Sequence, residues 1–364
     1  MRKIHILTTG FASPNSIAFL FPFIVFHREL RQVGINIEIF RDTVDDKLTD
    51  CDFLFIESRF YSQRWENDGD QKVLLEISEL SSRTPIIWFD ISDSTGWLQP
   101  QVLPFVLSYC KAQLYRDLTL YMKPHYGNRI WTDYYYRSVG IQDRNPAKPR
   151  VVTEQALLRK LHVSWNSGIA DYRVFGPHIM GLRQFLPFDF LFQLPRQFTP
   201  TSEARAIPWS CRMGLTYDRS SVSYQRQQIK NLLGAKLDTK KLSRLAYYAE
   251  MKKTRLVISP FGFGEITLKD FEATLCGAAL LKPDMSHMVT WPNIYRPNET
   301  MISHAWDLSD FDVKCAEALE SPGKVAQLAA AAQDEYRAAL DRRQAKANFC
   351  KRLLSILEQP TPLT

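Results

Sequence analysis

The sequence lacks the features that mark several common protein classes. Its six cysteines include no Cys-x-x-Cys pair, and neither His nor Cys occurs at a spacing typical of metal ligands. We therefore expect reduced thiols and no metal site. Residues 17–26 form an apolar run, but this run is too short to span a bilayer and carries Pro22. After the basic start of the chain only four residues precede Thr8, Thr9 and Gly10, so we expect no secretory signal and a cytoplasmic location.

The composition is that of a well-packed globular protein. Of 364 residues, 45% are hydrophobic and 12% aromatic, which argues against disorder and leaves room for two domains of ordinary size. Lys and Arg number 46 against 39 Asp and Glu, a formal net charge of +7. This excess is mild and spread along the chain, so it favours anionic ligands or an anionic membrane surface over nucleic acid.

Residues 257–293 hold the most informative stretch of the chain. Apolar runs predict buried strands at residues 256–258 and 278–281, and residues 267–275 predict a helix that stops before Gly277. The loop before the helix contains Gly262 and Gly264. Glycine lets the backbone approach a ligand closely, and the helix N-terminus offers unpaired N–H groups to an anion.

Two carboxylates extend this pattern. Glu265 lies in the loop and Glu272 on the helix, about two turns further on. A carboxylate can accept hydrogen bonds from ribose hydroxyls while N–H groups hold a diphosphate, so the stretch predicts a nucleotide-sugar site. The alternative is that Glu272 is only a solvated helix residue and that the glycines only form a turn.

The same residues resemble the donor-binding motif of GT-B glycosyltransferases, a Gly-rich loop followed by a glutamate and then Ala-x-x-x-Gly. Here the motif runs from Gly262-Phe263-Gly264 to Glu272-Ala273 and Gly277. Its longer form, over residues 259–265, 270–273 and 282–285, looks like the exostosin-like and bacterial cell-surface glycosyltransferases. Six residues separate the two glutamates, against seven in many retaining members, so the sequence leaves an inverting or a retaining outcome open.

The resemblance implies roles for these residues. The loop residues Gly262, Phe263 and Gly264 would bind the donor diphosphate together with the helix N-terminus. Glu272 would bind the ribose, and Glu265 would meet the sugar or the diphosphate as a catalytic candidate.

Basic side chains add further donor-binding candidates. Arg219 and Arg226 lie in a basic segment ahead of the motif, and we expect one of them to reach the diphosphate. Either arginine could equally lie on a solvated helix face. Lys282 and His287 lie at and after the end of the second predicted strand, on the side where ligands gather.

Strands and helices also alternate in the N-terminal half. Apolar runs predict strands at residues 3–7, 36–40, 52–56 and 85–89, with helices at residues 17–33 and 71–80. This alternation predicts a doubly wound parallel sheet covered on both faces, with ligands at the carboxyl ends of its strands.

Polar side chains follow the ends of these predicted strands. In a two-domain glycosyltransferase this edge receives the acceptor, so Asn15 and Arg59 are predicted acceptor-binding residues. Asp90 and Asp93, at the end of the fourth strand, are predicted to take the proton from the attacking hydroxyl of an inverting transfer. Asp93 could instead cap the next segment, because aspartate is common at helix starts.

We therefore predict an α/β fold of two facing Rossmann-like domains, of GT-B type, with a C-terminal helix. Residues 143–148 give the strongest linker signal. Residues 1–147 would form the N-terminal, acceptor-side domain and residues 148–345 the nucleotide-sugar-binding domain. Residues 346–364 would form the C-terminal helix, which could cross back to the N-terminal domain.

The resemblance implies transfer of a sugar from a nucleotide-sugar to a hydroxyl of a glycan or lipid-linked glycan. It implies no metal and no cofactor, and a role in cell-surface polysaccharide synthesis of the O-antigen, capsule or lipopolysaccharide type. The protein could contact an anionic inner membrane face peripherally, and nucleic acid is not expected as a partner. The alternatives are a nucleotide-sugar epimerase or hydrolase on the same fold and a non-catalytic glycan-binding protein.

Overall fold

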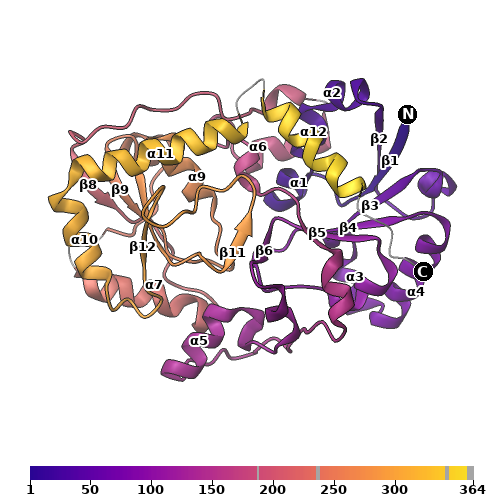
Figure 1. Cartoon of the computed structure of the whole chain (residues 1–364), viewed down its shortest axis with the longest axis horizontal. Coiled ribbons are helices and arrows are strands. Elements are labelled where there is room, and N and C mark those ends of the chain that lie inside the picture. Colours follow the sequence, from indigo (N-terminus) through magenta and orange to yellow (C-terminus); the bar gives the residue numbers. More distant parts are fainter. Residues whose placement is uncertain (187, 235–237, 341–343, 359–364) are drawn as a thin grey trace.

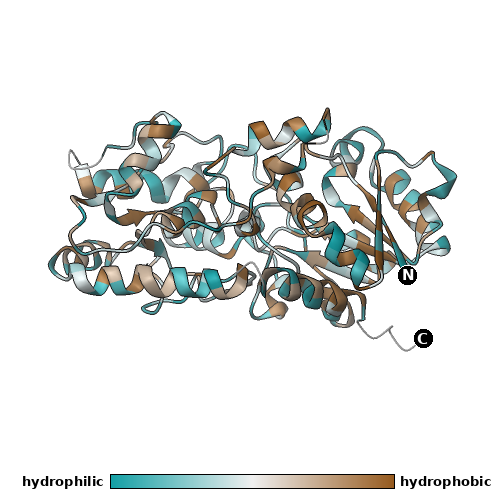
Figure 2. Ribbon diagram, turned by 90° about the horizontal axis from the view of Figure 1, so that it is seen from above, coloured by the Kyte–Doolittle hydropathy of each residue, from teal (hydrophilic) through white to brown (hydrophobic). Residues whose placement is uncertain are grey.

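The computed structural model of the chain describes residues 1–186, 188–234, 238–340 and 344–358. Its elements form two α/β units that lie side by side, the first built from the N-terminal part of the chain and the second from later residues (Figure 1). In Figure 2 most helices carry both hydrophilic and hydrophobic residues. This mixture is expected where one face of a helix packs on a sheet and the other faces water.

The first unit is built on a parallel sheet with the strand order β2-β1-β3-β4-β5-β7. Its strands are β1 (Arg2–Leu7), β2 (Ile35–Phe40), β3 (Phe53–Glu57), β4 (Ile86–Asp90), β5 (Ser108–Lys111) and β7 (Leu161–Val163). Every residue of β4 and β5 is buried, because helices cover both faces of a parallel sheet. The helices of this unit are α1 (Pro14–Val25), α2 (His27–Gln32), α3 (Ser62–Asn67), α4 (Asp70–Arg83) and α5 (Ile130–Val139).

The single helix predicted over residues 17–33 is in fact two helices, α1 and α2, separated at Phe26. Helix α1 starts earlier than predicted because the Ser13 side chain caps it and Pro14 fits its first turn. Pro22 lies inside α1 and has no N–H to give to Ala18. The Trp165 indole N–H donates to the Ala18 carbonyl instead, at 3.2 Å, so that buried acceptor is satisfied.

The second unit has a smaller parallel sheet with the strand order β12-β10-β9-β8. Its strands are β8 (Ile207–Ser210), β9 (Thr254–Ile258), β10 (Ala279–Pro283) and β12 (Ile302–His304). The helices are α6 (Pro177–Met180) in the segment between the sheets, then α7 (Ser220–Leu233), α8 (Arg244–Met251), α9 (Leu268–Leu275), α10 (Phe311–Glu320) and α11 (Pro322–Leu340). The predicted order of strand, glycine loop, helix and strand over residues 256–281 is confirmed as β9, α9 and β10.

A short antiparallel ribbon joins the two units. Strand β6 (Gln113–Tyr115) of the first unit pairs with β11 (Met288–Thr290) of the second. Nearby, the Tyr135 hydroxyl donates to the Trp306 carbonyl at 2.8 Å and accepts from the Gln225 amide at 2.6 Å. These contacts hold the sheets in a fixed relation to each other.

The C-terminal helix α12 (Gln344–Leu357) returns to the first unit (Figure 1). Phe349 packs against Phe26 with ring centroids 5.4 Å apart and against Trp165 at 5.1 Å. The predicted α/β fold of two Rossmann-like units with a C-terminal helix is thus confirmed. Residues 359–364 of the predicted helix lie outside the described part of the chain.

The N-terminal sheet continues past residue 147. Strand β7 pairs with β5, so residues 161–163 belong to the first sheet. Within the stretch expected to be a linker, Asp143 accepts hydrogen bonds from the backbone N–H and hydroxyl of Ser221, both at 2.8 Å. That stretch is therefore tied to the start of α7. In the part of the chain that the structure describes, no helix is long and apolar enough to cross a membrane.

Candidate functional site

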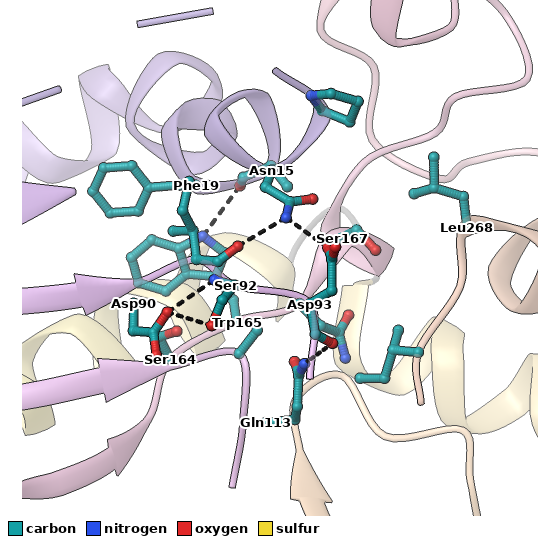
Figure 3. A pocket seen from close by; sticks show the side chains of 16 residues that line it. Asn15, Phe19, Asp90, Ser92, Asp93, Gln113, Ser164, Trp165, Ser167 and Leu268 are labelled. Atoms are coloured by element: carbon teal, nitrogen blue, oxygen red, sulfur yellow. Dashed lines mark hydrogen bonds between the residues drawn. The ribbon is translucent and has the colours of Figure 1, made fainter. Parts of the chain in front are cut away.

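The two units face each other across a cavity of about 220 Å³. It lies at the carboxyl ends of β4, β5 and β7, beside the start of α1 and opposite the start of α9 (Figure 3). We call it the cleft cavity. The first unit contributes mainly polar side chains and two aromatic rings, and the second contributes Ile266 and Leu268. Its position matches the rule that ligands bind at the carboxyl ends of strands in parallel sheets.

Asp93 is the exposed carboxylate of the cleft cavity. Asn15, at the start of α1, donates to Asp93 Oδ1 at 2.7 Å and to the Ile91 carbonyl at 2.8 Å. Gln113 donates to the Asp93 carbonyl at 2.6 Å, as Figure 3 shows. Among the described residues nothing donates to Asp93 Oδ2, so this oxygen remains available to a hydroxyl. The structure thus brings two predicted residues, Asn15 and Asp93, together.

Asp90 does not fit the predicted role of a base. It is 2% exposed. Its Oδ1 accepts from the Ser92 N–H and hydroxyl at 2.9 and 2.6 Å, and its Oδ2 accepts from the Tyr109 hydroxyl at 2.8 Å and from Lys111 Nζ at 3.1 Å. Both oxygens are therefore occupied by groups of the same sheet edge. Asp90 therefore connects the ends of β4 and β5. Asp93 is the carboxylate that is exposed in the cleft cavity.

Gly264 of the glycine loop makes its close approach to the backbone of the first unit. A Cβ on Gly264 would lie 1.7 Å from the Asp93 carbonyl oxygen, so only glycine allows this contact. Gly262 has more room, because a Cβ there would meet nothing closer than Arg226 Nη2 at 3.5 Å. The close approach predicted for the diphosphate is made at Gly264 to the first unit instead.

Glu265 is fully buried where the loop meets the first unit. Its Oε2 accepts the Thr95 N–H at 3.0 Å, and its Oε1 lies 3.7 Å from His287 Nε2. Burial alone would raise the pKa of Glu265, but His287 and the Thr95 N–H outweigh burial and hold this pKa below its ordinary value. Glu265 therefore links the second unit to the first through the Thr95 N–H, whereas its contact with His287 lies within the second unit. Roles for Glu265 and His287 at the sugar or diphosphate stay predictions.

Two of the basic residues predicted to bind the nucleotide-sugar, Arg226 and Lys282, form contacts within the second unit. Arg226 is buried and donates to the carbonyls of Phe261 at 2.7 Å and Gly214 at 3.0 Å; burial lowers its pKa. Lys282 is fully buried and pairs with Asp270 at 3.1 Å. Asp270 also caps α9. Lys282 Nζ and the Nε and Nη1 of Arg226 are thus used inside the fold, and contact of either residue with the donor stays a prediction.

Glu272 does line an open pocket, of about 760 Å³, which we call the Glu272 pocket. Its carboxylate accepts from the hydroxyls of Tyr247 at 3.1 Å and Tyr248 at 2.6 Å. Burial raises the pKa of Glu272, and the two hydroxyls partly offset this rise. Four cationic side chains line the same pocket, namely Arg212, Lys241, Arg244 and Lys269. Tyr247 and Tyr248 were not identified from the sequence, because they lie outside the motif that singled out Glu272.

A third cavity, of about 420 Å³, lies between the units and shares Asp93 with the cleft cavity. We call it the arginine pocket, because four arginines line it: Arg59, Arg129, Arg150 and Arg219. Arg59 was predicted as an acceptor ligand, and Arg219 and Phe263 as donor ligands. Arg219 lies over the Phe263 ring, 6.0 Å from its centroid. Arg129 and Arg150 were not identified from the sequence.

Comparisons with known proteins find only distant structural matches. No protein-family profile matches the chain, and no curated protein matches it. HepE from Anabaena, solved in complex with UDP, is 13% identical over 98% of this chain and 100% of that one, with a TM-score of 0.46. Sucrose-phosphate synthase from Thermosynechococcus elongatus is 10% identical over 98% and 99%, with a TM-score of 0.48. A glycosyltransferase from Rickettsia africae is 8% identical over 99% of both chains, with a TM-score of 0.45.

Proposed function

We propose that the protein is a glycosyltransferase that moves a sugar from a nucleotide-sugar to a hydroxyl. The observation that carries this proposal is the Glu272 pocket. It combines a carboxylate for a ribose diol, tyrosine rings for the base, and the exposed cations Lys241 and Arg244 for a diphosphate. Arg212 lines the same pocket but is paired with Asp238 and Glu250.

The cleft cavity would then receive the reacting groups. The acceptor hydroxyl approaches Asp93, which takes its proton as the hydroxyl oxygen attacks the anomeric carbon of the donor. The bond from that carbon to the diphosphate breaks, and the nucleoside diphosphate leaves with the bonding electrons. Asn15 keeps Asp93 pointed at the acceptor through its 2.7 Å hydrogen bond. This route inverts the anomeric configuration and needs no group from outside the chain.

We expect Glu272→Ala to weaken nucleotide binding while the fold survives. Losing a charge-assisted hydrogen bond costs about 1.5–3 kcal/mol, which corresponds to a roughly 10- to 150-fold rise in Kd. Isothermal titration calorimetry with the nucleotide that binds would measure the change. Glu320→Ala is a matched control, because Glu320 is exposed at the end of α10 in the same unit. Equal affinities of wild type and Glu272→Ala would remove Glu272 from the site.

The wider setting is part of the proposal. The motif over residues 259–285 resembles those of bacterial cell-surface enzymes, so we place the reaction in polysaccharide synthesis of the O-antigen or capsule type. The acceptor would be a glycan or lipid-linked glycan. We place the protein in the cytoplasm, at the inner face of the membrane.

An exposed apolar segment supports peripheral membrane contact. Seven large hydrophobic side chains between residues 174 and 190 are at least 37% exposed, and they are Val174, Ile179, Leu182, Phe185, Leu186, Phe188 and Phe190. The groove next to this segment is lined by the basic residues His27, Arg31 and Arg183, of which Arg183 pairs with Asp189 at 2.7 Å. Apolar side chains beside basic ones suit the surface of an anionic bilayer.

Co-sedimentation with vesicles tests this contact. We expect the wild type to bind vesicles that contain phosphatidylglycerol, and the double variant Phe185→Ser with Phe190→Ser to lose most of this binding because it buries less apolar surface. Leu75→Ser is the matched control, since Leu75 is 61% exposed on α4 of the first unit. Equal sedimentation of all three proteins, or no binding by the wild type, would contradict the contact.

A further inference from the structure

The arginine pocket holds more positive charge than its own residues neutralise. None of its four arginines forms an ion pair with a carboxylate in the described part of the chain, whereas Arg64 on the adjacent α3 is held by Asp68 at 2.9 Å and Glu76 at 2.6 Å. Of the carboxylates that line the pocket, Asp90 is committed to Lys111. Only Glu66 and Asp93 remain to balance the four guanidinium groups.

Two of the four guanidinium groups, those of Arg129 and Arg150, donate to backbone carbonyls of the described residues, and the other two do not. Arg129 donates to the carbonyls of Phe263 at 2.7 Å and Gly127 at 2.8 Å. Arg150 lies over the Trp97 ring, 4.4 Å from its centroid. The guanidinium groups of Arg59 and Arg219 have no hydrogen-bond partner among the residues described, although that of Arg219 lies over the Phe263 ring. Arg59 belongs to the first unit and Arg219 to the second, so both guanidinium groups could bind a ligand that lies between them.

Two further donors in the wall of the pocket are also unused. Ser94 is 1% exposed, and its hydroxyl has no hydrogen-bond partner within the described residues. The same is true of the buried indole N–H of Trp65. Both residues line the arginine pocket. Buried donors without partners carry a desolvation cost that a ligand rich in acceptor oxygens would remove.

The rest of the wall suits a saccharide. Trp65, Trp97 and Phe263 place aromatic surface around the donors, and aromatic faces pack against the apolar face of a sugar ring. The pocket shares no lining residue with the Glu272 pocket, but it shares Asp93 with the cleft cavity. A sugar in the arginine pocket would thus lie beside the proposed base and away from the proposed nucleotide site.

We propose that the arginine pocket binds a negatively charged group, a carboxylate or a phosphate, on the acceptor saccharide. Guanidinium groups bind both kinds of oxyanion through paired N–H donors. The charged group would lie between Arg59 and Arg219 and bring a neighbouring hydroxyl to Asp93. This inference rests on the proposed function, since it names the class of acceptor for the same reaction.

Ligand-observed NMR titration tests the pocket without knowledge of the full acceptor. The probes are glucuronic acid, glucose 6-phosphate and neutral glucose, each titrated against the full chain. We expect binding of one or both anionic sugars at least about tenfold tighter than that of glucose. The double variant Arg59→Gln with Arg219→Gln should remove this preference. Arg144→Gln is the matched control, because Arg144 is exposed and lines none of the three cavities.

The possible outcomes distinguish a carboxylate from a phosphate as the bound group. They also distinguish failure of this inference from failure of the proposed function. Preference for glucuronic acid alone indicates a carboxylate, and preference for glucose 6-phosphate alone indicates a phosphate. Equal binding of all three sugars, or a preference that survives in the double variant, overturns the inference. Loss of nucleotide affinity in the double variant would instead assign the pocket to the donor and also overturn it. If the wild type prefers an anionic sugar but binds no nucleotide, the anion site stands while the proposed function fails.

Discussion

Replacing Asp93 with asparagine is expected to lower kcat by about 10²–10⁴-fold, the usual effect of losing a general base. Asparagine keeps the shape of the side chain, and its oxygen can still accept the 2.7 Å hydrogen bond from Asn15. It cannot take up the acceptor proton. Donor affinity should not change, because the Glu272 pocket shares no residue with the cleft cavity. Steady-state kinetics and nucleotide titration on the same preparation measure both quantities.

Asp90→Asn is the informative comparison. It removes one charge of a fully buried ion pair with Lys111, and an uncompensated buried charge costs about 3–5 kcal/mol of the free energy of unfolding. Chemical denaturation should therefore show a marked loss of stability for Asp90→Asn and little loss for Asp93→Asn. An Asp93→Asn enzyme with the kcat of the wild type would reduce Asp93 to a structural residue. A product that retains the donor's anomeric configuration would exclude Asp93 as the base of an inverting transfer, whatever the kcat.

A valine at Gly264 is expected to abolish turnover while nucleotide binding persists. Its Cβ would lie 1.7 Å from the Asp93 carbonyl oxygen, a distance that no side-chain movement can relieve because the oxygen belongs to the backbone. The two units must then move apart, and the 3.0 Å contact between Glu265 and the Thr95 N–H would break. Asp93 would no longer face the start of α9 as it does in the cleft cavity.

Gly262→Ala provides the matched control on the same loop. A Cβ there has 3.5 Å of room, so both turnover and nucleotide affinity should stay near those of the wild type. Turnover by Gly264→Val at the rate of the wild type would show that the contact between the units is not needed for the reaction. Loss of nucleotide binding in Gly264→Val alone would show that the loop contacts the donor, as the motif in the sequence implies.

Much of the fold could be predicted because buried parallel strands appear in the sequence as short apolar runs. The runs at residues 3–7, 36–40 and 85–89 differ from β1, β2 and β4 by a residue or so at an end. The ribbon of β6 and β11 could not be predicted in this way. Each strand has three residues, and its partner lies more than 170 positions away, so neither periodicity nor a hairpin turn marks it.

The candidate site was predicted only in part, for a physical reason. Glu272 and Asp93 were recognised from their places after a glycine loop and after a strand. The same reasoning also selected Lys282 and Glu265, which are buried and paired with Asp270 and His287. Whether a charged side chain faces a ligand or braces the loop depends on its tertiary partner, and spacing does not reveal that partner.

The arginine pocket is a second example of a site that the sequence does not reveal. Arg59 follows β3, Arg129 precedes α5, Arg150 lies in a loop, and Arg219 precedes α7. These residues share no motif and come together only when the two units pack. A cavity of this kind becomes visible only after folding places its residues together.

The most direct test of the central claim is a thermal-shift screen of the wild type and Glu272→Ala against UDP, GDP, CMP and dTDP. At a hundredfold excess over Kd a ligand of the folded state adds about 2.7 kcal/mol to its stability. We predict that one nucleotide raises the Tm of the wild type and that this rise is reduced or lost in Glu272→Ala. The absence of a shift with all four nucleotides, or an equal shift in both proteins, would contradict a nucleotide-sugar site at Glu272.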